Sequence, residues 1–308
     1  VVAIHGNFDN AQSGVKAMFE NKELAKELAE HGYQFSSANS INIGRLVPQV
    51  AYYVYAYAKL LKNGEIENGE KMNVVVPTGN FGNILAAYYA KHMGVPIQKL
   101  ICASNENKVL FDFFETGTYD KNREFVLTTS PSMDILISSN LERLIYLISG
   151  CDAGKTAELM QALKTDGTYE ITEDMRERLA DFAAGYATEA QTAQAIHDTY
   201  HKTGYVMDTH TAVASYVCEE YRRTSGDETK CVIASTASPY KFVKSVMTAV
   251  DEKYADAGEF DLLPELQRVS GTEMPNAVRE ILHAEVLHTL ECDVDKMEET
   301  VKGILKIK

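Results

Sequence analysis

Two glycines and two asparagines occupy the loop PTGNFGN (residues 77–83), which follows three valines and precedes an apolar segment. In an open parallel sheet, ligands bind at the carboxyl ends of strands, where such loops lie. Gly79 and Gly82 would let the backbone approach a ligand closely, and a helix N-terminus attracts anions. Asn80 and Asn83 add amide donors. The loop lacks the P-loop and G-x-G-x-x-G patterns, so by itself it is equally consistent with a phosphate site and with a plain turn.

A second polar cluster, SSANSINIGR (residues 36–45), opens a helical pattern. Serine and asparagine are common N-cap residues, and one cap accounts for two of them. The remaining neutral polar groups, together with Arg45, suit the bidentate capture of an anion. Helix capping and anion binding are therefore both open interpretations of this segment.

Three later segments carry polar side chains that could contact a ligand. IASTASPYKF (residues 233–242) brings hydroxyl groups to the end of a short strand pattern, although Pro239 also fits the first turn of a helix. In MDTHTAVA (residues 207–214), Asp208 and His210 are candidates for proton transfer or substrate contact, and a capping aspartate beside a structural histidine is the commoner alternative. SPSMDILISSNLER (residues 130–143) is too polar for a core strand and suits a segment that lines a site.

Short β-branched runs alternate with helix patterns along the chain, which predicts an α/β fold with a largely parallel sheet. Residues 152–202 are rich in charges and helix formers, and we interpret them as a helical insertion or a cap on the sheet. Pro48 should kink the helix expected from about residue 41, unless that helix begins just before Pro48. We expect strands at residues 1–5, 74–76, 99–103 and 230–234, and helices at 11–20, 21–31, 41–62, 83–93 and about 276–290.

Size and charge limit the possible functions. The chain has 308 residues, of which 45% are hydrophobic, enough for one large core or two domains. Its net charge is −14 and it has no dense Lys/Arg cluster, which argues against a nucleic-acid partner. No apolar run approaches the roughly 18–20 residues of a membrane span. Five cysteines without a C-x-x-C spacing favour a reduced, cytoplasmic location over a disulfide framework or a zinc site.

Six segments, taken in order, resemble the bacterial threonine synthases: HGNFDNAQ, SSANSINIGRLVPQ, VVPTGNFGN, SMDI with SSNLER, DTHTAVA and STASPYKF. The resemblance implies the tryptophan-synthase-β-like fold, called fold type II, in which helices flank a largely parallel sheet. It implies pyridoxal phosphate as cofactor and a carbon–oxygen lyase of threonine biosynthesis, which converts O-phospho-L-homoserine and water to L-threonine and phosphate. The implied domains are the end of a small domain at residues 1–35 and a large domain at 36–308.

The resemblance also implies roles for individual residues. Thr236 would hydrogen-bond the pyridine nitrogen, and a neutral hydroxyl there weakens the ring as an electron sink. Asp208, His210 and Lys241 are further possible site residues, and Ser238 stands where the family usually has histidine. The cofactor phosphate would be held by Gly79, Asn80, Phe81, Gly82 and Asn83. The substrate would be contacted by Ser37, Asn39, Ser40, Asn42 and Arg45.

One family feature has no counterpart in this sequence. The family carries its Schiff-base lysine in an S-F-K-D-like segment before H-G-N-F-D, and no such segment occurs here. We therefore interpret the chain as the C-terminal part of a threonine synthase, truncated at the N-terminus and inactive alone. It should expose apolar surface and self-associate. The alternatives are another fold type II lyase, such as a serine/threonine dehydratase, and a non-catalytic phosphate-binding domain.

Overall fold

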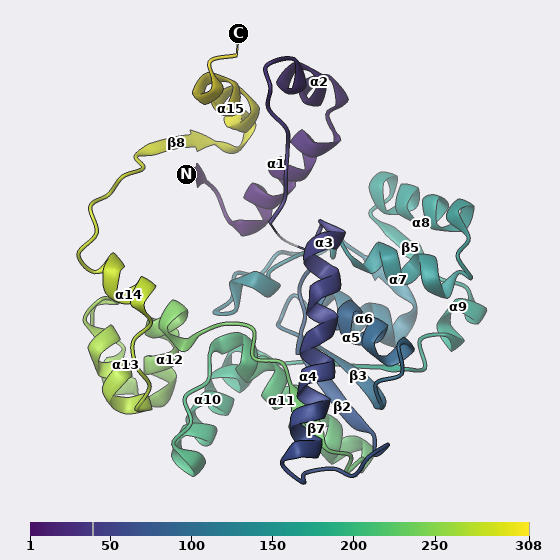
Figure 1. The fold of residues 1–308 in the computed structure, drawn as a ribbon, viewed down its shortest axis with the longest axis vertical. Helices are drawn as coiled ribbons and strands as arrows, with labels where there is room; N and C mark the ends of the chain where they lie inside the picture. Colours follow the sequence, from purple (N-terminus) through teal and green to yellow (C-terminus); the bar gives the residue numbers. More distant parts are fainter. Residues whose placement is uncertain (39, 308) are drawn as a thin grey trace. The chain divides into compact units, whose positions relative to one another are not determined.

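The computed structural model describes residues 1–38 and 40–307. The chain divides into two compact units, which we describe one at a time. The first unit comprises Val1–Ala38 together with Arg279–Lys308, and the second comprises Asn39–Val278. Figure 1 shows the elements of both.

The second unit is built on a parallel sheet with the strand order β6-β3-β2-β7. Every residue of β2 is buried, because helices cover both faces of the sheet, as is usual for parallel sheets. This sheet confirms the expected α/β fold with a largely parallel sheet flanked by helices (Figure 1). The strands are β2 (Met72–Pro77), β3 (Ile97–Ser104), β6 (Phe182–Tyr186) and β7 (Cys231–Ile233).

Alternate side chains of β2 pack against different helices, because successive residues of a strand point to opposite faces. Val74 and Val76 pack in the larger core cluster with apolar residues of α4, α5 and α6, whereas Val75 packs with residues of α11. The helices of this paragraph are α4 (Val50–Lys62), α5 (Gly82–His92), α6 (Val109–Thr116) and α11 (Thr209–Ser225).

Pro48 interrupts the helix that the sequence placed at residues 41–62. The segment forms α3 (Ile43–Leu46), the 3₁₀ turn η1 (Val47–Gln49) and then α4. Proline lacks the N–H of a regular α-helical bond, so the chain passes it in a tighter turn.

Residues 152–202 contain more than the expected helical insertion. The region holds α8 (Ala153–Thr165), β5 (Thr168–Glu170), α9 (Glu173–Glu177), β6 and α10 (Glu189–Thr203), and β5 pairs antiparallel with β4 (Thr118–Asp120). The helical interpretation is wrong for β6, which pairs along β3 at the edge of the central sheet. The misreading arises because Ala183, Ala184 and Gly185 lack the β-branched side chains that mark strands. Pairing with β3 therefore determines that these residues form a strand.

The remaining elements of the second unit are mostly short. They are η2 (Pro131–Met133), α7 (Leu141–Ile148), η3 (Pro239–Phe242), α12 (Val243–Val250), η4 (Glu252–Tyr254) and α13 (Leu262–Ser270). Helix α14 (Asn276–Ile281) spans the division between the units. The ten residues after Ser130 pass through η2 to the start of α7, which contacts the loop before α5.

The first unit joins the two ends of the described chain. Its strand β1 (Val2–His5) pairs in parallel with β8 (Leu290–Asp293). The turn η5 (Val294–Lys296) follows β8 and precedes α15. A small apolar cluster is buried by the helices α1 (Phe8–Glu20), α2 (Lys22–Glu30) and α15 (Met297–Leu305). The single helix expected near 276–290 ends at Ile281, and neither β8 nor α15 was predicted from the sequence. Residues 279–308 therefore group with the N-terminal segment, because the partner of β1 lies 288 positions along the chain.

Candidate functional site

Gly79 and Gly82 lie where neighbouring groups leave no room for a side chain. The loop follows the carboxyl end of β2 and starts α5. A Cβ atom on Gly79 would lie 2.4 Å from the backbone oxygen of Ser132, and one on Gly82 would lie 2.4 Å from Ser40 Oγ. Between them, Phe81 has a φ of +64°, which is rare for a bulky residue. Close packing and an unusual backbone conformation thus fix this turn.

The N–H groups and the carbonyl groups of the loop backbone differ in their hydrogen bonding. Among the residues that the structure describes, no acceptor faces the N–H groups of residues 79–83, and Phe81 provides no side-chain cap for α5. The carbonyl oxygens are occupied: Gly79 O accepts from Ser138 Oγ at 2.7 Å, and Asn80 O accepts from Asn140 N at 3.0 Å. Successive unbonded N–H groups at a helix N-terminus form an anion site. The loop therefore fits a phosphate group.

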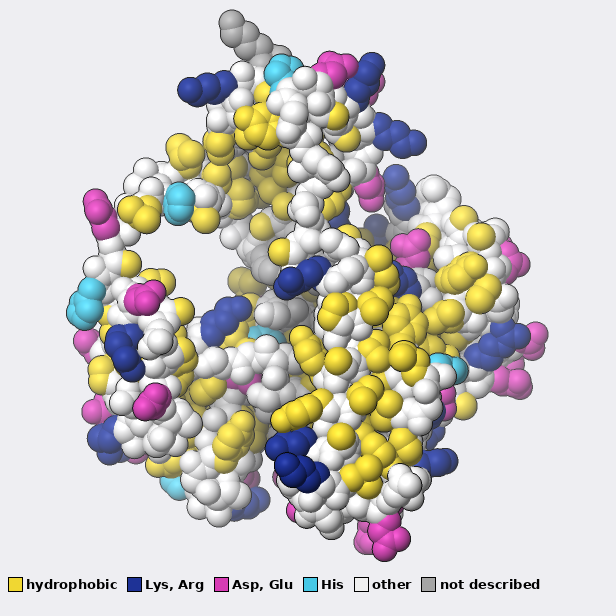
Figure 2. Space-filling view, viewed as in Figure 1, with side chains coloured by type: hydrophobic (Ala, Val, Ile, Leu, Met, Phe, Trp, Pro, Cys, Tyr) yellow, Lys and Arg dark blue, Asp and Glu magenta, His cyan; other side chains and the backbone are white. Residues whose placement is uncertain are grey.

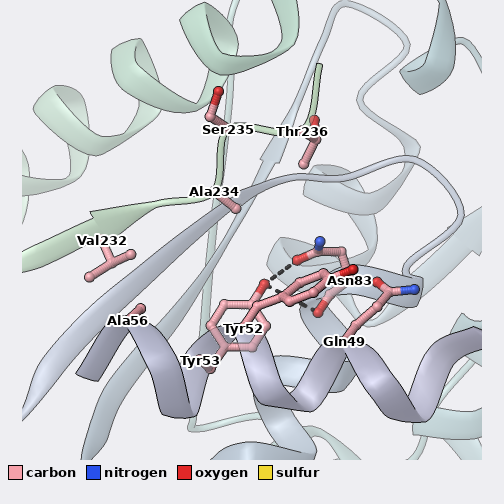
Figure 3. Close-up of a pocket in the computed structure, with 9 residues that line it drawn as sticks. All are labelled: Gln49, Tyr52, Tyr53, Ala56, Asn83, Val232, Ala234, Ser235 and Thr236. Atoms are coloured by element: carbon pink, nitrogen blue, oxygen red, sulfur yellow. Dashed lines mark hydrogen bonds between the residues drawn. The ribbon is translucent and has the colours of Figure 1, made fainter. Parts of the chain in front are cut away.

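The side chains of the loop differ in what they can contribute. The Phe81 ring is buried, with the rings of Phe114 and Phe182 6.1 and 6.0 Å away, so only its backbone can contact a ligand. The Asn80 Oδ1 accepts from Ser139 Oγ at 3.0 Å. The Asn83 Oδ1 accepts from the Tyr53 hydroxyl (Figure 3), whose pKa is raised by burial, so that it remains a donor. Both asparagines are thereby oriented with their amide NH₂ groups as the remaining donors.

A pocket of about 570 Å³ connects this loop with the end of β7, a size typical of small-molecule sites. Asn83 of the loop and Thr236, which follows β7, both line it (Figure 3). Of the described residues that line the pocket, none is a lysine. The structure therefore brings together two of the residues that the sequence assigned to a cofactor. The other lining residues are Gln49, Tyr52, Tyr53 and Ala56 of η1 and α4, and Val232, Ala234 and Ser235.

The structure describes four of the five residues that the sequence assigned in the 36–45 segment. Ser40 is half-buried beside Gly82, where its Oγ accepts from Asn140 Nδ2 at 3.1 Å. Asn42 caps α3 by accepting from Gly44 N at 2.9 Å, so the capping interpretation is confirmed for this residue. The Arg45 side chain is exposed on α3. Ser37 belongs to the other unit, and Asn39 lies outside the described residues.

Asp208 and His210 bond backbone groups, Asp208 at the start of α11 and His210 at Ser132, which packs on the glycine loop. Asp208 caps α11 by accepting from the N–H groups of His210 at 2.9 Å and Thr211 at 3.2 Å. Burial acts to raise the pKa of Asp208, but hydrogen bonds from His210 and Thr211 together lower it. The His210 Nε2 accepts from Ser132 N at 3.2 Å, and the Ser132 oxygen packs on Gly79. This arrangement fits the alternative of a capping aspartate with a structural histidine.

Hydrogen bonds to a buried carboxylate order the segment at residues 128–134. Asp134 is 2% exposed and accepts from Thr128 Oγ1 at 2.7 Å, Asn105 Nδ2 at 2.8 Å and Asn107 Nδ2 at 3.1 Å. Neutral donors satisfy the carboxylate, as a buried charge requires. The longer segment at residues 130–143 was expected to line a site, and in the structure Ser138 and Asn140 of this segment donate hydrogen bonds to the glycine loop.

The segment after β7 begins a helix, as one interpretation of its sequence proposed. Ser238 Oγ accepts from Tyr240 N, and Pro239 is in the first turn of η3. Lys241 lies beside the Phe242 ring, with its Nζ 5.3 Å from the ring centre, and does not line the pocket. Thr236, by contrast, is exposed and reaches the pocket.

Among the side chains that the structure describes, no group of three or more His, Cys, Asp or Glu has an arrangement that could hold a metal ion. Over the same residues, no helix has the length and apolar character to cross a membrane.

Comparisons with known proteins agree on one family. The family model described as "Threonine synthase, C-terminal" matches residues 211–301. The chain is 44% identical over 255 residues to Threonine synthase-like 1 of Homo sapiens. This alignment covers 82% of the present chain and 34% of that relative. It is 37% identical over 282 residues to the threonine synthase of Saccharomyces cerevisiae, which covers 86% of this chain and 53% of the relative.

Solved structures show the same relationship. The chain superposes on the crystal structure of pyridoxal-phosphate-bound threonine synthase from Brucella melitensis with a TM-score of 0.78 at 34% identity. It superposes on the yeast threonine synthase with a TM-score of 0.79 at 30% identity. Each superposition covers 99% of this chain and 58% of the other. The chain thus spans between a third and about three fifths of the length of these relatives.

Proposed function

Because this chain is related to the threonine synthases in sequence and in fold, we propose that it carries the cofactor-phosphate and substrate side of a threonine synthase. The observation that carries the proposal is the glycine loop, whose N–H groups at residues 79–83 lack acceptors among the described residues while its carbonyl groups are bonded. The shared pocket of Asn83 and Thr236 supports it.

In this proposal, the loop holds the phosphate of pyridoxal phosphate and Thr236 directs its hydroxyl to the pyridine nitrogen. When bound, this cofactor supplies an electron sink for reactions at the α-carbon of an amino acid. A neutral hydroxyl at Thr236 leaves the pyridine nitrogen unprotonated. Tyr53 keeps Asn83 oriented toward the pocket through its hydroxyl, and Gln49 and Tyr52 close the side formed by η1 and α4 (Figure 3).

We assign the substrate to the segment next to this pocket. The exposed guanidinium of Arg45 can bind the phosphate of O-phospho-L-homoserine through two parallel hydrogen bonds. Ser40, beside Gly82, and Asn42 belong to the same segment, and we extend the assignment to Ser37 and Asn39. Since the described residues that line the pocket include no lysine, we propose that the lysine that attaches the cofactor comes from a different segment of the working enzyme.

Turnover distinguishes the candidate activities. The intact protein, supplied with pyridoxal phosphate, should release inorganic phosphate from O-phospho-L-homoserine and form L-threonine in equal amounts. Conversion of L-threonine to an oxoacid without phosphate release would instead indicate a dehydratase. Binding of pyridoxal phosphate and of inorganic phosphate without any turnover would indicate a phosphate-binding domain or an enzyme that needs a further segment. Binding of neither compound would contradict the proposal.

Gly79→Ala tests the loop directly. The added methyl group would meet the Ser132 oxygen at 2.4 Å, so either the loop or the segment behind it must move. We expect the affinity for pyridoxal phosphate, measured by titration calorimetry, to fall at least tenfold, equivalent to about 1.4 kcal/mol. Gly303→Ala is the matched control, because its new Cβ meets no atom within 4 Å. Equal affinities for the two variants would contradict the assignment of the loop.

We also propose that the protein is cytoplasmic and associates with a second copy of itself. The five cysteines, all within the described residues, are free, which supports a reducing compartment. Hydrophobic side chains gather over α4 on the face shown in Figure 2. On α3, η1 and α4, the exposed residues Ile43, Val47, Val54 and Tyr55 recur at helical spacing and form what we call the apolar stripe.

A further inference from the structure

Two buried side chains behind the glycine loop donate hydrogen bonds to its backbone. We propose that Ser138 and Asn140 are positioning residues that set the conformation of the loop at residues 79–83 and connect it with the start of the 40–45 segment. The inference rests on the proposed function, because it treats this loop as the phosphate site. Neither residue would touch the cofactor, since both bind carbonyl oxygens, on the side of the loop opposite to the N–H groups of residues 80 and 81.

The contacts fix two consecutive peptide groups. Ser138 Oγ donates to Gly79 O at 2.7 Å. Asn140 donates to Asn80 O twice, from its Nδ2 at 2.7 Å and from its backbone N at 3.0 Å. A peptide group is planar, so holding its oxygen on one side directs the N–H of the next residue to the other side. The N–H groups of residues 80 and 81 are therefore aimed by bonds made to the carbonyls of residues 79 and 80.

Asn140 makes these bonds in place of a common local one. It is the N-cap residue of α7, and an asparagine there usually accepts from the first N–H groups of its own helix. The Asn140 side chain makes no such cap bond and is 1% exposed. Its Oδ1 accepts from Arg143 Nη1, which leaves its Nδ2 facing Asn80 O and Ser40 Oγ. The start of α7 thus has no side-chain cap, and the Asn140 side chain bonds to the glycine loop instead.

Arg143 extends the connection to the proposed substrate segment. Its Nη1 donates to Ser40 O at 3.0 Å and its Nη2 donates to Ile41 O at 2.9 Å. Asn140 Nδ2 also donates to Ser40 Oγ at 3.1 Å. One short stretch at the start of α7 therefore bonds both to the loop assigned to the cofactor phosphate and to the residues that precede Asn42 and Arg45. Disturbing Asn140 should affect both segments.

Ser138→Ala and Asn140→Ala test the inference in the intact protein. Each variant removes a buried donor to the loop backbone, and we expect the affinities for inorganic phosphate and for pyridoxal phosphate to fall on the order of tenfold, as measured by titration calorimetry. The N–H order parameters of Gly79 and Gly82, measured by NMR without any ligand, should decrease toward the flexible range, below about 0.6. Unchanged order parameters and unchanged affinities would overturn the inference.

Two controls separate positioning from general damage to the fold. Ser149→Ala removes a hydroxyl at the other end of α7, where it donates to Tyr146 O, and should leave the loop unchanged. Asn140→Asp keeps the size of the side chain, its acceptor for Arg143 and the capacity to cap α7, but its side chain cannot donate to Asn80 O, and only the backbone N–H bond to that oxygen remains. Loop order parameters lowered by Asn140→Asp at an unchanged melting temperature support positioning, whereas wild-type order parameters contradict it.

The proposed function can fail without the inference failing. If wild-type protein binds neither phosphate nor pyridoxal phosphate, the phosphate site is wrong, yet the order parameters of Gly79 and Gly82 still report whether Ser138 and Asn140 hold the loop. If the wild type binds both compounds and the variants match it in affinity and in loop order, the positioning role is wrong and the phosphate site stands.

Discussion

Thr236 is the residue that we propose as the partner of the cofactor ring. Its side chain is exposed in the pocket that also contains Asn83, and the loop around it is anchored nearby, where Thr211 Oγ1 donates to Ser235 Oγ at 3.0 Å. A hydroxyl can donate to or accept from a ring nitrogen without adding charge to the pocket. Thr236 is therefore the residue at which a functional effect can be measured with little effect on the fold.

Thr236→Val should reduce function without unfolding the protein. The change keeps the shape of the side chain and removes its hydroxyl, so from the proposed function we expect phosphate release from O-phospho-L-homoserine by the intact protein to fall tenfold or more, equivalent to about 1.4 kcal/mol. Because the residue is exposed, its free energy of unfolding should change by less than about 0.5 kcal/mol. Thr236→Ser, which retains the hydroxyl, is the control. A fully active valine variant would show that the hydroxyl has no role.

The types of the site residues could be predicted from the sequence, but not the use of every side chain. The glycines and asparagines of residues 79–83 were equally consistent with an anion loop and with a plain turn, because glycine allows close backbone approach in either case. That Phe81 points into the core, and that Ser138 and Asn140 bind the back of the loop, follows from contacts across 59 and 60 residues of sequence. The polar run SSNLER was the only signal for the latter pair.

At the scale of elements, a carboxylate joins the sheet to the helix behind it. Asp227 Oδ2 accepts from Asn73 Nδ2 of β2 at 2.8 Å and from the Tyr221 hydroxyl of α11 at 3.0 Å, and its Oδ1 accepts from Thr229 N at 2.9 Å. The hydrogen bond from Thr229 contributes most to lowering the pKa of Asp227, against the effect of burial, and Asn73 and Tyr221 lower it further. These bonds hold the start of β7 beside β2.

This carboxylate predicts a defined acid sensitivity. Since its pKa is lower in the folded protein than in the unfolded chain, its contribution to stability is complete above the unfolded value of about 3.9 and is lost as the pH falls below it. Asp227→Asn should therefore lower the free energy of unfolding by about 1–3 kcal/mol at neutral pH and lose less on acidification than the wild type. Urea unfolding at several pH values measures both. The exposed Glu228→Gln is the control, and parallel pH profiles for wild type and Asp227→Asn would refute the role.

Elements with strong local patterns could be predicted, and elements that depend on distant partners could not. The valines of β2 and the proline before α4 carry their own signals, and the structure has both features near the expected residues. In β6, the residue types at Ala183 to Gly185 do not identify a strand by themselves. Their pairing with β3 makes this segment a strand. Gly185 also allows α11 to approach, because a Cβ there would lie 2.7 Å from Val217 Cγ1.

At the scale of the molecule, the apolar stripe opposes the effect of the net charge. A charge of −14 keeps copies of the chain apart. The stripe favours contact, because Val47 of η1 and Tyr55 of α4 are 52% and 65% exposed. Contiguous exposed apolar surface of this kind marks interaction sites. Which effect is stronger can be measured directly.

Val47→Glu should shift the protein toward the monomer. Light scattering over a range of concentrations should show self-association of the wild type and a weaker or absent association of the variant, since a carboxylate in the stripe would have to be desolvated on contact. Lys62→Gln, on the exposed surface at the end of α4, changes the net charge by the same amount and should behave as the wild type. A wild type that is monomeric at all concentrations would contradict the proposed self-association.

The pairing of β1 with β8 has a consequence for the order in which the protein is made. A ribosome completes all of the second unit before it reaches residues 290–293, so the larger unit can fold while the partner of β1 does not yet exist. During that interval, β1 presents an unpaired strand edge, a template for wrong pairing with other chains. Translation pauses late in the message would lengthen this exposure, so nascent chains stalled after residue 278 should be the ones that bind chaperones most strongly.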